Sequence, residues 1–97
     1  MALKQATGKL SLLRVHNVGS KFGPATDQID VEVVFRLAQT GTQSYGFQLR
    51  DDGNRAARQG MLDLLRDAFN HNWTVTTDFE IASGKHNGVS IRVWLTR

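Results

Sequence analysis

The chain has 97 residues, of which 40% are hydrophobic and 22% are charged, and its formal net charge is +3. This length supports one domain, residues 1–97, with a single core, and the composition is that of a folded chain rather than a disordered one. Cysteine is absent, which excludes disulfides, thiol catalysis and cysteine-ligated zinc. Core packing, or association with further copies, must therefore hold the fold together.

The sequence contains no apolar run of about 18 residues, the length that a membrane-spanning helix needs. The first residues, "MALKQATGKLSLL", lack the apolar stretch of a signal peptide. We therefore expect a cytoplasmic domain of bacterial type. A secreted protein whose leader has been removed is the alternative.

The first predicted strand covers residues 8–18 and changes phase in its middle. Leu10 and Leu12 share one face, whereas Leu13 and Val15 share the other. Such a slip in alternation predicts a β-bulge or a sharp bend in the strand. Residues 19–28, "GSKFGPATDQ", contain the only proline and predict a loop.

Two further strands, 29–37 and 45–50, follow with clear alternation and a short connection, which predicts a hairpin. In the first of them Val34 lies on the polar face, with charged neighbours on both sides. The residues expected to face the core are Ile29, Val31, Val33, Phe35, Leu37, Tyr45, Phe47 and Leu49; those expected to face solvent are Asp30, Glu32, Val34 and Arg36.

The period then changes to that of a helix, which begins after Asp52 or Asn54 and ends at Asn70 or Asn72, residue types that favour helix caps. Gly60 lies inside this helix, where glycine costs about 1 kcal/mol relative to alanine. We expect a close approach of the helix to the sheet at this position. The apolar stripe of the helix consists of Ala57, Met61, Leu64, Leu65, Ala68 and Phe69.

The last two strands are predicted at 73–81 and 88–97, joined by the turn 82–88, "ASGKHNG". Alternation in the final strand places its four aliphatic residues inward and Trp94 on the solvent side with Ser90 and Arg92. Leaving a tryptophan exposed forgoes roughly 2–3 kcal/mol of burial, so Trp94 marks a contact surface. It can pack beneath its own chain, anchor a subunit interface, or stack on a sugar or base.

The order strand, strand, strand, helix, strand, strand predicts a mostly β fold with one helix (α+β). Together with the bent first strand, it favours a five-stranded antiparallel OB-like barrel. An open antiparallel sheet with the helix packed on one face is the alternative.

The segment "GMLDLLRDAFNHNWTVTTDFEI", an amphipathic helix that leads directly into a strand, resembles the corresponding segment in pentameric B subunits of bacterial AB-type toxins. That resemblance covers the order of elements and this one segment. It implies an OB-fold that binds glycans as a ring of subunits. Those subunits usually carry a disulfide and a signal peptide, which this chain lacks, so no glycan-binding residue is carried over.

Catalytic motifs are not evident in the sequence. His16, His71 and His86 show no metal-ligand spacing, and neither GxSxG nor a phosphate-binding glycine motif occurs. We therefore expect a protein that is not an enzyme and that holds no cofactor and no metal.

In OB-like domains the ligand surface is the face of the second and third strands, flanked by the loops between strands one and two and between strands four and five. The ligand-binding candidates in these loops are Lys21, Phe22, Lys85, His86 and Asn87. The first functional hypothesis is a non-enzymatic binding module that self-associates through an outer strand face containing Trp94, Val34 and Arg92.

Two alternatives stand beside self-association. One is single-stranded nucleic-acid binding through Lys21, Arg36, Arg50 and Lys85, against which the carboxylates Asp30 and Glu32 on the same face argue. The other is a small molecule or glycan bound in a pocket or loop site. Any ligand of the self-associating module would use the two glycine-containing loops, whereas a small-molecule enzyme or carrier would have its pocket between the helix and the sheet.

Overall fold

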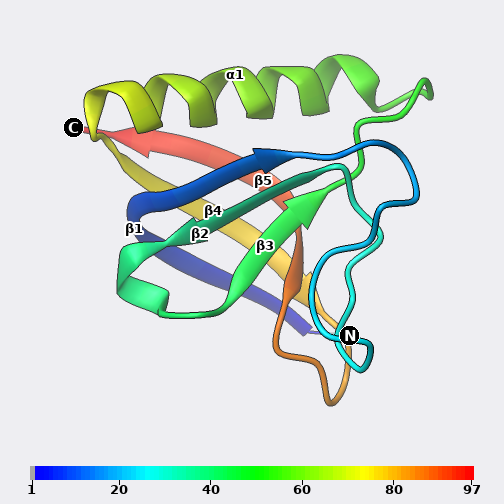
Figure 1. Cartoon of the computed structure of the whole chain (residues 1–97). Coiled ribbons are helices and arrows are strands. Elements are labelled where there is room, and N and C mark those ends of the chain that lie inside the picture. Colours follow the sequence, from blue (N-terminus) through cyan, green and yellow to red (C-terminus); the bar gives the residue numbers. More distant parts are fainter. Residues whose placement is uncertain (1) are drawn as a thin grey trace.

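The computed structural model describes residues 2–97 of the chain. Over that range the elements follow the expected order of three strands, one helix and two strands (Figure 1). Their bounds are β1 Ala2–Val15, β2 Val33–Leu37, the short 3-10 helix η1 Ala38–Thr40, β3 Ser44–Phe47, α1 Arg55–His71, β4 Thr74–Ile81 and β5 Gly88–Thr96. The fold is therefore mostly β with one helix over these residues.

The strands close into a ring in the order β1-β2-β3-β5-β4, an arrangement compatible with the OB-like architecture. The sheet is mixed rather than wholly antiparallel, because β3 and β5 run parallel through the pairs Tyr45–Gly88 and Gly46–Val89. The expectation of a purely antiparallel sheet was wrong at this seam. The other four strand pairs of the ring are antiparallel.

The strand β1 bends as predicted, but the register shift lies between Leu10 and Leu12, one step before the predicted slip at Leu12–Leu13, so Leu10 and Leu12 do not share a face. Residues 2–9 pair with β4 and residues 10–15 pair with β2. One long strand thus contributes to both sides of the ring, which requires it to change direction. The strand begins before residue 8 and ends at Val15, so residues 16–18 belong to the following loop.

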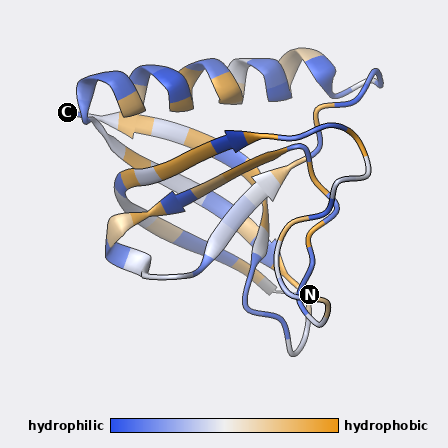
Figure 2. Cartoon of the chain, in the orientation of Figure 1, coloured by the Kyte–Doolittle hydropathy of each residue, from blue (hydrophilic) through white to orange (hydrophobic). Residues whose placement is uncertain are grey.

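The helix α1 lies across one end of the ring and contacts β1, β4 and β5 (Figure 1). Hydrophobic segments are prominent along the strands, whereas hydrophobic and hydrophilic bands alternate along α1 (Figure 2). Leu65 and Ala68 from the helix are buried in the main core, whose other buried members are Val33, Phe35, Leu37, Tyr45, Phe47, Val75, Phe79 and Val93.

Both ends of α1 are near the predicted caps, although the details differ. Asn54 occupies the N-cap position without a side-chain capping bond, while Asp52 Oδ1 accepts a hydrogen bond from the Asn54 amide at 2.9 Å. At the other end Asn72 adopts the left-handed conformation, with φ of 57°. A β-carbon on Gly60 would meet no heavy atom from outside its own helix within 4 Å, so the expected close approach to the sheet was wrong.

The segment 29–32 does not extend β2, contrary to the predicted strand 29–37. Ile29 pairs only with Phe22, in an isolated bridge that folds the β1–β2 loop (residues 16–32) back on itself. This loop covers the outer face of β2, so Val34 is fully buried there although its side chain belongs to that face. A second hydrophobic cluster results, consisting of Ile29, Val31 and Val34 with Leu12 and Phe22 packed against it.

The strand β5 departs from simple alternation because of a register shift opposite the Asp78–Phe79 step. Val89 and Ile91, predicted to face the core, are 40% and 46% exposed. Ser90, predicted to face solvent, is buried and its hydroxyl lies 2.8 Å from that of Thr77. A polar partner inside the ring thus accounts for a buried serine.

Beyond the bulge the predicted phase is restored. Val93 is buried in the core and Leu95 packs against it. Trp94 consequently lies on the outer face, opposite Thr76 of β4 in the register, and its side chain is half-buried. Residues 48–50, predicted to end the third strand, lie outside β3.

Candidate functional site

A cavity of about 510 Å³ lies where the β1–β2 loop, the β4–β5 loop (residues 82–87) and the β2–β3 hairpin meet. The two loops gather at the end of the molecule away from α1 (Figure 1). We call this space the loop cavity. The side chains of its wall that matter below are those of Phe22, Asp27, Arg36, Thr42, Ser44 and His86.

Asp27 ties the two loops together. Its Oδ2 accepts hydrogen bonds from the backbone amide of His86 at 2.9 Å, and from the backbone amide and side-chain Nδ2 of Asn87 at 3.2 and 3.1 Å. Lys85 Nζ donates a further bond to the carbonyl oxygen of Thr26. Because Asp27 and Asn87 are both buried, these bonds hold the wall of the cavity in a fixed shape.

Asn87 also joins the loops to the sheet. Its Oδ1 accepts a hydrogen bond of 2.8 Å from the backbone amide of Ser44, the first residue of β3. Gln43 Nε2 donates to the carbonyl oxygen of His86 at 2.8 Å. Hydrogen bonds therefore join the β1–β2 loop, the β4–β5 loop and the β2–β3 hairpin into one unit.

Arg36 brings the positive charge of the loop cavity. Its Nε donates to Ser44 Oγ at 2.9 Å, and its guanidinium carbon lies 5.5 Å from the centroid of the Phe22 ring. Arg14 lies 5.2 Å from the same centroid, so two cations contact one aromatic ring. Within residues 2–97 the two Nη atoms of Arg36 make no hydrogen bond or ion pair, which leaves their donors available to a ligand.

The imidazole of His86 lies on the hairpin side of the loop cavity, with its Nε2 3.5 Å from Thr42 Oγ1. One of these two groups donates to the other, so the pair offers a ligand one donor beside the Arg36 guanidinium and the Ser44 hydroxyl. Such a set suits an oxyanion, which accepts several hydrogen bonds at once.

Of the predicted loop residues, Phe22, His86 and Asn87 lie in the wall of the loop cavity. Lys85 lines a neighbouring cavity of about 340 Å³ instead, and Lys21 is exposed and lines neither of these two cavities. Arg36, predicted only for nucleic-acid contact, joins the wall. Sequence reasoning missed Asp27 and Ser44, whose roles depend on partners 60 and 43 residues away.

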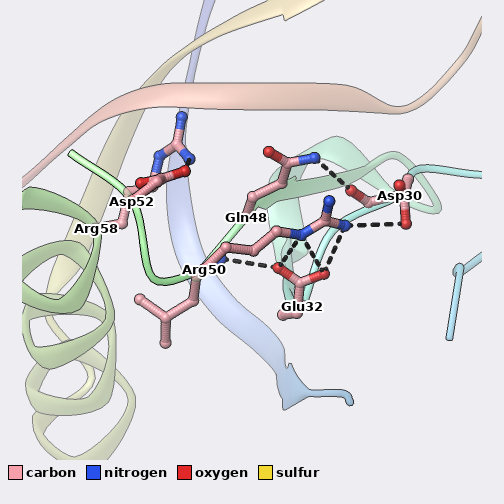
Figure 3. A network of polar contacts seen from close by, with 7 residues as sticks. Asp30, Glu32, Gln48, Arg50, Asp52 and Arg58 are labelled. Carbon is pink, nitrogen blue, oxygen red and sulfur yellow. Dashed lines mark hydrogen bonds and ion pairs between the residues drawn. The ribbon is translucent and has the colours of Figure 1, made fainter. Parts of the chain in front are cut away.

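Arg50, the other cation predicted for nucleic-acid contact, is engaged elsewhere (Figure 3). Its guanidinium lies 3.0 Å from the buried carboxylate of Glu32 and 3.2 Å from that of Asp30. Glu32 Oε1 also accepts the amide of Leu49 at 2.9 Å. The hydrogen bond with Glu32, followed by that with Asp30, raises the pKa of Arg50 above its ordinary value, so the group stays charged.

The outer face of β1, β4 and β5 carries Trp94 in a row with Thr76 and Thr7, whose hydroxyls lie 3.1 Å apart. The next row contains Arg92, which pairs with Asp78 at 3.1 Å while remaining largely exposed. Exposed apolar side chains near this end of the three strands are those of Leu3, Val89 and Ile91, while Val15 is exposed at the far end of β1. Val34, predicted to share a surface with Trp94, is covered by the β1–β2 loop and contributes nothing to it.

Comparisons with protein-family models, with curated proteins and with solved structures found no match to this chain. The resemblance to toxin B subunits therefore rests on element order and the one helix-to-strand segment.

Among residues 2–97 no group of three or more histidine, aspartate or glutamate side chains is arranged to hold a metal ion. No helix of this range is both long enough and apolar enough to cross a membrane.

Proposed function

We propose that this protein is a small binding module that takes an anionic ligand in the loop cavity. The observation that carries the proposal is the guanidinium of Arg36, which is held by Ser44 and Phe22 while both Nη atoms face no partner in the described chain. A cation fixed in position with unused donors is an arrangement that recognises carboxylate or phosphate groups.

The environment of Arg36 supports an anion rather than a neutral ligand. The one carboxylate in the wall, Asp27, already accepts three N–H groups, which offsets its charge. The cations Arg14 and Lys85 lie on the same loop side of the molecule. A volume of about 510 Å³ lies within the range of small-ligand sites, roughly 300–1,000 Å³.

The fold supports the location. In OB-like proteins the loops between strands one and two and between strands four and five flank the ligand. Here the same two loops are joined by Asp27 and Asn87 before any ligand arrives, which reduces the ordering cost of binding.

The test measures binding of thymidine monophosphate to the full chain by calorimetry, comparing Arg36→Gln with Arg66→Gln. Both variants remove one arginine charge, but Arg66 lies exposed on α1, where its ion-pair partner is Asp63. We expect Arg36→Gln to weaken binding by about tenfold or more and Arg66→Gln to leave it unchanged. Equal affinities for the two variants, both folded by thermal melting, would overturn the proposal.

A second candidate function, self-association, is favoured by the outer face of β1, β4 and β5. Half-buried Trp94 lies there with exposed Leu3, Val89 and Ile91, and tryptophan is enriched at the centres of subunit contacts. The proposed occupant is a second copy of this chain, with the exposed Arg92 at the rim of the contact.

Light scattering tests self-association directly. We expect an oligomer that Trp94→Thr dissociates without unfolding, whereas Phe69→Ser, at an exposed aromatic residue of α1, leaves it assembled. A wild-type protein that stays monomeric at high concentration contradicts this second proposal and leaves the loop cavity unaffected.

A further inference from the structure

The surface that usually binds ligands in OB-like barrels, the face of β2 and β3, is blocked in its middle by this chain's own loop. Val34 of β2 is fully buried beneath Ile29 and Val31. Gly46 of β3 pairs with Val34, and a β-carbon there would lie 2.5 Å from Val31 Cγ2. The loop therefore packs directly on the strand backbone, with no room for a ligand between them.

The end of this face away from the loop cavity is occupied by ion pairs between charged side chains of this chain. Asp30 and Glu32 hold Arg50 between them, and Gln48 Nε2 donates to the carbonyl oxygen of Asp30 (Figure 3). One cation is thus matched by two carboxylates. Because like charges repel, this end disfavours the phosphates of a nucleic-acid backbone.

Only the hairpin end of the face stays open, where the loop cavity lies. The Nη atoms of Arg36, the Ser44 hydroxyl and the Thr42–His86 pair belong to residues that line this one cavity of about 510 Å³. A single-stranded nucleic acid needs a continuous cationic path with aromatic platforms for successive bases. Phe22, the aromatic residue of the wall, already contacts Arg14 and Arg36.

We infer that the ligand of the loop cavity is a small molecule bearing one phosphate group and that an extended nucleic-acid strand is not bound. The inference rests on the proposed function and adds the ligand class. Phosphate is favoured over carboxylate because a tetrahedral oxyanion presents more acceptor oxygens to the guanidinium, hydroxyl and imidazole groups of the residues that line this cavity. Asp27 belongs to the same wall and is the acidic group facing the ligand.

The experiment measures affinity for inorganic phosphate, acetate, thymidine monophosphate and oligothymidylates of increasing length, at low salt and then at rising salt. We expect phosphate compounds to bind more tightly than acetate. Affinity should change by less than about threefold from the mononucleotide to the longest oligonucleotide. For the oligothymidylates the salt dependence should correspond to about one phosphate, with a slope near −0.7.

A second readout locates the ligand by amide chemical shifts in nuclear magnetic resonance spectra. Saturating thymidine monophosphate should shift the amides of Ser44, His86 and Asn87, which border the loop cavity. The amides of Gln48 and Leu49, at the closed end of the face, should not shift. The converse pattern would contradict the inference.

The possible results distinguish a wrong ligand class from a wrong proposed function. Affinity that rises steadily with strand length, with a salt slope of several phosphates, overturns the inference of a small ligand. If Arg36→Gln still weakens oligonucleotide binding in that case, the proposed function stands. Acetate that binds as tightly as phosphate overturns the ligand class alone. If none of the anions binds at low salt, both the inference and the proposed function are wrong.

Discussion

Val31 of the β1–β2 loop packs directly against the backbone of Gly46 in β3. A β-carbon at position 46 would lie 2.5 Å from Val31 Cγ2 and 2.7 Å from the carbonyl oxygen of Val33. The glycine therefore makes the close approach of loop and strand possible. This contact keeps the loop on the sheet and leaves the loop cavity as the open end of the face.

The first prediction concerns this contact. Gly46→Ala should lower the free energy of unfolding by about 1–3 kcal/mol, because the added methyl group must displace either Val31 or the neighbouring strand backbone. Urea denaturation measures the change. Gly53→Ala is the control, since no heavy atom lies within 4 Å of a β-carbon there, and it should change stability much less. Similar values for the two variants would show that the contact is not tight.

The second prediction concerns the buried carboxylate of Glu32. Arg50→Met should lower the urea midpoint more than Arg66→Met, because it leaves a carboxylate that is 2% exposed without its bidentate partner. Arg66 pairs with the exposed Asp63 at 3.7 Å, a surface contact of small value. A midpoint for Arg50→Met equal to that of the control would mean that the ion pair contributes nothing net.

The third prediction concerns two glycines at which an added β-carbon would meet open space. Gly60→Ala should raise the free energy of unfolding by about 0.5–1 kcal/mol. Gly60 lies inside α1, where alanine is the better helix former, and the added β-carbon would meet no heavy atom from outside its own helix within 4 Å. Gly84→Ala should lower the free energy of unfolding by about 1–2 kcal/mol, because Gly84 has φ of 77°. Thermal or urea denaturation gives both values, and changes of the same sign would refute the conformational explanation.

The fourth prediction concerns alkaline pH. Burial raises the pKa of the Tyr45 hydroxyl above its ordinary value of 10.0, with a smaller opposing effect from a hydrogen bond with Thr40. The folded state therefore keeps the proton longer than the unfolded state, so this contribution to stability is complete below pH 10.0 and is lost as pH rises through the folded pKa.

Urea denaturation at pH values on both sides of 10.0 measures this loss. Tyr45→Phe is the comparison, because lysines titrate in the same range in both proteins. The variant loses the hydrogen bond to Gln43 Oε1 but should show a shallower decline at high pH. Identical declines would mean that the tyrosine does not titrate differently in the two states.

The sequence by itself determined the element order, the bend of β1 and most of the core. These features follow from local periodicity, since the residues that reveal them are neighbours along the chain. The predicted phase slip at Leu12–Leu13 indicated the bend because alternation is read over a few residues, although the register shift itself lies between Leu10 and Leu12. Trp94 was placed on the outer face for the same reason.

The tertiary structure alone decided what covers each face. Val34 alternates outward as predicted, yet it is buried because Ile29 and Val31 leave the strand and pack over it together with the distant Leu12 and Phe22. Val89 and Ile91 are exposed because a bulge opposite β4 interrupts an alternation that looks regular in the sequence. Asp27 and Asn87 form the wall of the loop cavity through hydrogen bonds that span 60 residues. Long-range partners such as these leave no local pattern, so only the closed ring of strands brings Arg36, Ser44 and His86 to one place.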